Sequence, residues 1–152
     1  MGYKKYLIWA PPYRRSSAGN VVLHKLCHLL NEKGLTAYIT GRPNPEWKER
    51  YADEPKIKEL VSEDAIAVYP EVAIGNPFNA KYVVRYILQK HAFPKRWSKH
   101  EILFCYNPFL ERYVDRPGRI LEIPWIDEPN LFNNDSNYAR SGALFYVGKA
   151  KN

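Results

Sequence analysis

Short apolar runs alternate with stretches of helical periodicity along this chain of 152 residues. The first run, residues 6–10, stops at two prolines that cannot continue a strand ladder, so it predicts a buried strand. In residues 22–30 the apolar side chains recur at helical spacing, and a lysine and a glycine follow, which predicts a helix and its end. Residues 35–40 form the next apolar run. Strand, helix and strand in this order make a βαβ unit.

The alternation continues to the end of the chain. It predicts an α/β fold, a Rossmann-like open parallel sheet flanked by helices. Residues 41–55, with three prolines among charged residues, are expected to form a surface excursion with at most a helical turn near Trp47. The remaining predicted elements are a strand at 65–69, a helix at 79–90, a strand at 102–106, a short helix at 110–114 and strands at 120–123 and 143–147.

Composition limits the class of protein. Apolar residues make up 45% of the chain and charged residues 26%, which is typical of a globular domain with a buried core. No run approaches the roughly 20 apolar residues of a membrane span, and the first run is too short for a secretory signal. Two cysteines are too few for a disulfide framework or a Cys-ligated zinc site. A cytoplasmic setting is expected.

The balance of charge favours an anionic partner without selecting one. The net charge of +7 suits nucleic acid, a phospholipid surface or a phosphorylated small molecule, and it equally suits a solvated basic surface. The basic residues are dispersed, in pairs such as Lys4-Lys5 and Lys95-Arg96, and form no continuous tract. Nucleic-acid binding is therefore disfavoured.

The loop before the first predicted helix has the chemistry of an anion site. Residues 16–20 supply hydroxyls, a glycine and backbone N–H groups at the positive end of the helix dipole, where a phosphate could bind near Gly19 and Asn20. Arg14 and Arg15 precede this loop. The alternative is that the loop only caps the helix and turns the chain. Neither the dinucleotide-binding glycine motif nor a P-loop occurs.

Loops that follow the other predicted strands place polar groups at the same edge of the sheet. Glu71 follows residues 65–69 and could accept substrate hydroxyls or act as a base, or it could be an exposed loop acid. Asn76 lies behind it, and Asn107 follows residues 102–106.

His24 and His28 are four residues apart in the first predicted helix. This spacing can hold a metal, but the intervening residues are not those of a zinc-protease helix, and two histidines alone do not make a site. A packing or surface role is favoured for both, and no metal is expected.

Four segments resemble, in this order, the N-terminal half of a GT-B-fold bacterial glycosyltransferase of the group 1 (family 4) type. Such enzymes transfer a sugar from a nucleotide-sugar donor in polysaccharide and cell-surface glycan synthesis. The segments are the strand and glycine loop at 6–20, the strand and loop at 68–77 with 82–86, the pattern at 123–132 and the strand-glycine-lysine pattern at 145–149.

The resemblance implies a division into domains. Residues 1–132 would be a Rossmann-like acceptor-side domain, 133–142 a linker, and 143–152 the first strand and loop of a truncated donor domain. The donor domain, on the order of 150 residues, would be supplied in cis or in trans, and the isolated chain would be inactive as a transferase. The alternative is a non-enzymatic α/β domain that binds a nucleotide or a phosphorylated ligand.

The resemblance also implies roles for residues and partners, although it identifies no catalytic residue. The partners would be a nucleotide sugar and a glycan or lipid-linked acceptor, with peripheral contact at the inner face of the membrane. No cofactor and no metal are expected, in keeping with the lack of an Asp-x-Asp pair. The implied and inferred site residues are Gly19, Asn20, Gly148 and Lys149 at the donor phosphates, Glu71, Asn76 and Asn107 on the acceptor side, and Arg14 and Arg15 for phosphate or lipid.

Overall fold

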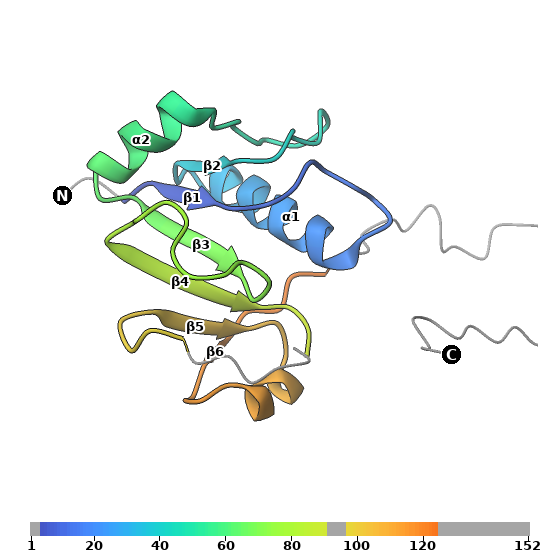
Figure 1. Cartoon of the computed structure of the whole chain (residues 1–152). Coiled ribbons are helices and arrows are strands. Elements are labelled where there is room, and N and C mark those ends of the chain that lie inside the picture. The colour runs from blue at the N-terminus through green and yellow to red at the C-terminus, as the bar shows by residue number, and fades with distance from the viewer. Residues whose placement is uncertain (1–3, 91–96, 125–152) are drawn as a thin grey trace, which may run out of the picture.

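One parallel sheet organises the part of the chain that the computed structural model describes, residues 4–90 and 97–124 (Figure 1). Its strand order is β2-β1-β3-β4-β5-β6, and every neighbouring pair is parallel. The predicted α/β, Rossmann-like class is confirmed. The elements are β1 (Tyr6–Ile8), α1 (Ala18–Glu32), β2 (Ala37–Ile39), α2 (Glu54–Ser62), β3 (Ile66–Pro70), β4 (Tyr82–Ile87), β5 (Ile102–Cys105), the 3-10 helix η1 (Pro108–Tyr113) and β6 (Arg119–Ile120).

Helices α1 and α2 cover opposite faces of the sheet. Successive side chains of a strand point to opposite faces, and in β1 Ile8 packs in the cluster of Val22 from α1, whereas Leu7 packs with Leu60 from α2. Helix α1 ends where Gly34 takes a φ of +78°, a conformation that glycine adopts without strain. The sheet is thus a layer between two helices, with its carboxyl edge left for loops.

Helix α2 lies in a stretch for which the sequence pattern predicted no element. Its start is specified locally, because the Asp53 side chain accepts a hydrogen bond from the backbone N–H of Lys56 at 3.0 Å and Pro55 occupies the first turn. Only Leu60 of this helix is fully buried, with Ile57 and Val61 partly buried beside it, so its apolar face is short. The predicted turn near Trp47 is present, with Trp47 N–H donating to the Asn44 carbonyl at 3.1 Å.

The helix predicted at 79–90 is wrong, because this stretch contains strand β4. Val83 packs against β3 residues on the α2 face, while its neighbour Val84 packs against the α1 cluster, as the side-chain alternation of a strand requires. A strand buried on both faces is apolar at nearly every position, so its pattern is easily mistaken for a buried helix. The crossover from β3 to β4, residues 71–81, consequently contains no helix.

The later predictions fare differently. The strand at 102–106 is confirmed as β5, the short helix at 110–114 is η1, and the strand at 120–123 is reduced to β6. The predicted linker at 133–142 and the strand at 143–147 lie outside the described residues. Within the described ranges, no helix is long and apolar enough to cross a bilayer.

Candidate functional site at the carboxyl edge of the sheet

The site lies between β1 and β3, where the connections of the sheet diverge. From β1 the chain passes through α1 to β2 on one side, while β3 pairs with β1 on the other. Open α/β sheets bind ligands in the crevice at the carboxyl ends of such strands. A cavity of about 340 Å³ occupies this place, and we call it the switch pocket. It is lined by Trp9, Pro11, Ser17, Ala18, Gly19, Asn20, Leu23, Pro70, Glu71, Val72, Leu88 and Gln89.

The N-terminus of α1 forms one wall of the switch pocket. The N-cap residue Ser17 is extended and its side chain makes no capping hydrogen bond, and the first turn contains no acidic residue. The helical ladder begins with Val21 N–H, which donates to the Ser17 carbonyl at 2.9 Å. The N–H groups before Val21 therefore lie at the positive end of the helix without a side-chain cap, an arrangement that suits an anion.

Gly19 lies close to the end of β4 in this wall. A Cβ at Gly19 would meet the Leu88 side chain at 3.6 Å, an ordinary contact distance. The position therefore tolerates a methyl group sterically, and the glycine is not required by packing.

Asn20 shapes the loop before α1 with its side chain. Its Oδ1 accepts from Arg14 N–H at 2.7 Å, and its Nδ2 donates to the carbonyls of Pro11 and Pro12 at 3.1 and 3.3 Å. The side chain is buried, at 6% exposure. The hydrogen bonds of its side-chain amide thus hold the β1–α1 loop in place.

Glu71 forms the opposite wall as a buried carboxylate. It directly follows β3 and is only 2% exposed, so the interpretation as an exposed loop acid is wrong. Its Oε2 accepts from the backbone N–H of Leu88, just beyond β4, at 2.8 Å. The structure brings Glu71, Gly19 and Asn20, predicted from two separate loops, into one pocket.

Four other predicted residues of the described part lie outside the lining of the switch pocket. Asn76 closes the β3–β4 loop by accepting from Tyr69 Oη at 2.9 Å and by pairing with the backbone of Ala80. Asn107 caps η1 through a 3.3 Å hydrogen bond from Leu110 N–H. Arg14 and Arg15 are exposed in the loop before α1. Gly148 and Lys149 lie outside the described residues.

The sequence analysis missed the apolar wall of the pocket. Trp9 lies just after β1, Val72 follows Glu71, and Leu88 was assigned to the wrongly predicted helix. The β-branched and aromatic residues that make up most of β4 are the signal that would have predicted a strand there and placed Leu88 at the carboxyl edge.

His24 serves packing, as expected. Its Nδ1 lies 3.0 Å from Glu49 Oε2 and its Nε2 lies 2.9 Å from the Pro11 carbonyl, with both side chains fully buried. His28 Nδ1 accepts from Lys48 N–H at 2.9 Å. Both imidazoles fasten the 41–51 loop to α1, and the described residues include no cluster of three or more metal-ligating side chains.

The surroundings of both cysteines disfavour a nucleophilic role. Cys27 and Cys105 are free thiols that are completely buried. Burial raises the pKa of Cys27 to about 12 and raises that of Cys105 as well. These shifts disfavour the thiolate, the form in which a cysteine acts as a nucleophile.

Comparisons of the chain with protein-family models, with curated proteins and with solved structures found no match.

Proposed function

We propose that this chain is the acceptor-side domain of a glycosyltransferase of bacterial polysaccharide or cell-surface glycan synthesis. The supporting observation is that one pocket combines the uncapped N-terminus of α1 with the buried carboxylate of Glu71. A ligand that carries both a phosphate and sugar hydroxyls has complementary groups for these two walls.

Each of the two walls would bind a different group of the ligand. Backbone N–H groups around Gly19 would receive the phosphate, since they offer donors and a positive dipole end. Glu71 would accept a sugar hydroxyl, and the side chains of Trp9 and Val72 would contact the apolar face of the ring. The carboxylate would repel a phosphate at its own end of the pocket, which orients the ligand.

Transfer needs a second domain in this proposal. That domain, in the same polypeptide or in a partner, would hold most of the nucleotide sugar, and the isolated chain would bind ligand without transferring sugar. No resident cofactor or metal is part of the proposal.

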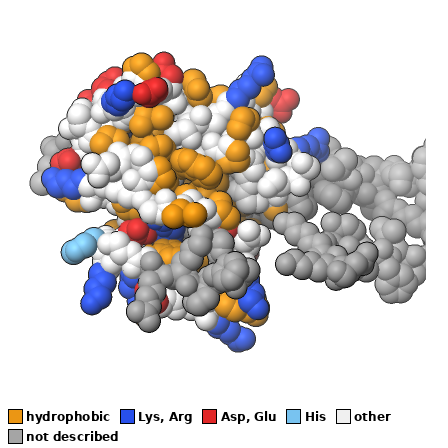
Figure 2. Space-filling model, in the orientation of Figure 1, with side chains coloured by type: hydrophobic (Ala, Val, Ile, Leu, Met, Phe, Trp, Pro, Cys, Tyr) orange, Lys and Arg blue, Asp and Glu red, His pale blue; other side chains and the backbone are white. Residues whose placement is uncertain are grey.

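Peripheral contact with the inner face of the cytoplasmic membrane completes the proposal. The chain carries a net charge of +7, and anionic headgroups attract basic surfaces. In the face shown in Figure 2, Lys and Arg side chains lie mostly toward the periphery, and hydrophobic side chains gather in the middle. In this view the basic groups form no continuous stripe of the kind that marks a nucleic-acid interface.

The test is a titration of the ¹⁵N-labelled chain with UDP, GDP and a hexose 1-phosphate. Binding should shift the amide resonances of Gly19 and Leu88 first. Glu71→Gln should weaken the sugar phosphate about tenfold or more, because a hydrogen bond to a charged group is lost. Glu111→Gln, which changes an exposed carboxylate on η1, is the matched control and should leave affinity unchanged.

Two outcomes would count against the proposal. Absence of binding by all three ligands would remove the phosphate site. Binding by the chain, with no sugar transfer by the native protein isolated from its source cells, would instead favour the non-enzymatic binding domain.

A further inference from the structure

The crossover from β3 to β4 is unusual because it joins two parallel strands without a helix. Parallel neighbours are normally connected through an α-helix, which satisfies its own backbone groups. Residues 71–81 contain no regular element, so their buried carbonyls need donors from elsewhere. The conformation of this loop sets the position of Glu71.

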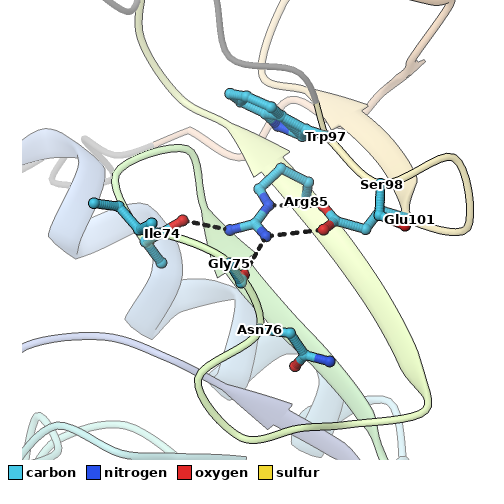
Figure 3. Close-up of a pocket in the computed structure, with 8 residues that line it drawn as sticks. Ile74, Gly75, Asn76, Arg85, Trp97, Ser98 and Glu101 are labelled. Atoms are coloured by element: carbon cyan, nitrogen blue, oxygen red, sulfur yellow. Dashed lines mark hydrogen bonds and ion pairs between the residues drawn. The ribbon is translucent and has the colours of Figure 1, made fainter.

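Arg85 of β4 supplies these donors. Its side chain is buried, and its Nη1 donates to the carbonyls of Ala73 at 2.7 Å and Pro70 at 3.4 Å, while Nη2 donates to the Gly75 carbonyl at 2.7 Å. Figure 3 shows the guanidinium between the loop and Glu101. One planar side chain thus binds three carbonyls, one from the last residue of β3 and two from the crossover.

Glu101 holds the guanidinium from the other side. Arg85 Nε donates to Glu101 Oε2 at 3.0 Å and Nη2 donates to Oε1 at 3.2 Å. The aromatic rings of Tyr69 and Trp97 lie 5.1 and 5.9 Å from the guanidinium carbon. With its five N–H groups directed at protein acceptors, Arg85 has none left for a ligand.

The carbonyls that Arg85 holds flank Glu71 in the chain. Pro70 precedes Glu71 and Ala73 follows it by two residues, and both carbonyls bind the same Nη1. The Glu71 carboxylate is held in turn by Leu88 N–H, three residues beyond Arg85. Arg85 of β4 therefore holds the backbone on both sides of Glu71, while Leu88, just beyond β4, binds its carboxylate.

We infer that Arg85 is a positioning residue for the carboxylate of Glu71 in the switch pocket. The expected effect of Arg85 on ligand binding rests on the proposed function. Its effect on the position of Glu71 does not. The planar guanidinium of arginine is required here, because the single ammonium group of a lysine cannot bind three carbonyls and two carboxylate oxygens in this geometry.

The Leu88 amide proton is a direct reporter of this placement. It is hydrogen-bonded to a carboxylate in the folded chain, so its resonance changes when the carboxylate moves or is replaced. The resonance in Glu71→Gln provides the reference for a lost charge-assisted bond. The measurement needs no ligand, so it remains decisive if no ligand of the proposed class binds.

The experiment compares Arg85→Lys with the unchanged chain. Arg85→Lys should move the Leu88 amide resonance toward its position in Glu71→Gln and weaken hexose 1-phosphate about tenfold. A folded Arg85→Lys chain with the Leu88 resonance unmoved would overturn the inference. If the Leu88 resonance moves in Arg85→Lys but the variant binds hexose 1-phosphate as tightly as the unchanged chain does, the role of Arg85 in ligand binding is overturned.

A second variant covers the case in which Arg85→Lys does not fold. Gly75→Ala keeps the guanidinium but strains the residue whose carbonyl it binds, because Gly75 has a φ of +66° in open space. Gly34→Ala is the matched control, with a φ of +78° and equally open surroundings at the end of α1. Both should lose similar stability, and only Gly75→Ala should move the Leu88 resonance. The same response from both variants, or from neither, would refute the coupling.

Discussion

Adding one methyl group at Gly41 should separate two segments that the fold holds in backbone contact. An ideal Cβ at this position would lie 2.2 Å from the Pro11 carbonyl oxygen, 2.5 Å from its carbon and 2.7 Å from the Ala10 oxygen. These atoms belong to the chain just after β1, next to the switch pocket. Gly41 follows β2, so Gly41→Ala acts at the carboxyl edge of the sheet.

The size of the effect follows from these distances. Contacts below 3.0 Å are essentially never seen for a real Cβ, so the two segments must move apart by about 1 Å. The movement would also stretch two hydrogen bonds of the Thr40 hydroxyl, which accepts from the N–H of Ala10 and donates to its carbonyl, both at 3.2 Å. Overpacking costs about 1–3 kcal/mol. The contacted atoms belong to the backbone and cannot move aside by a change of rotamer. We therefore expect Gly41→Ala to lower the free energy of unfolding by about 3 kcal/mol.

Urea and thermal unfolding, followed by circular dichroism, measure this loss. In a chain of this size, 3 kcal/mol corresponds to a fall in Tm of about 6–12 °C. Gly19→Ala is the control, because its Cβ has an ordinary 3.6 Å contact with Leu88 and a helical alanine is favoured over glycine. Equal stabilities for Gly41→Ala and the parent chain would show that this close approach does not exist in solution.

Two further predictions concern buried polar groups. Glu49→Ala should lower the free energy of unfolding by roughly 3–5 kcal/mol, because it leaves the buried His24 and the Asn44 N–H without their carboxylate partner. A loss below about 1 kcal/mol in a urea titration would contradict the burial of the His24–Glu49 pair. Burial raises the pKa of Cys27 from 9.0, and of Tyr69 from 10.0, to about 12 each, so the folded state retains protons that the unfolded state releases. Stability should therefore hold below pH 9 and fall as the pH rises toward 12, and urea midpoints from pH 8 to 11 should decline less steeply in Cys27→Ala.

The sequence predicts the fold better than it predicts the individual elements. The βαβ start is clear because α1 has one apolar face and β1 ends at prolines. The pattern misses β4 because that strand is buried on both faces, and it misses α2 because the apolar face of this short helix consists of Ile57, Leu60 and Val61 alone. The class of fold survives these errors because β1, α1, β2, β3 and β5 lie where the pattern predicts them.

The candidate site shows the same limit. Glu71 and Gly19 are predictable because loops after parallel strands meet at one edge of the sheet. Leu88 and Arg85 are not, since both lie in the stretch mistaken for a helix. The function of Arg85 also depends on three carbonyls that no side-chain pattern records.

The central place of β1 has a consequence for synthesis of the protein. This strand leaves the ribosome well before one of its two partners, β3, which begins 60 residues later, where Tyr6 pairs with Ile66. At a translation rate of about 5–20 residues per second, β1 waits roughly 3–12 s before that edge can be covered. During this interval an apolar strand with free backbone groups is exposed, and it is the segment of the nascent chain where a chaperone would have most to protect.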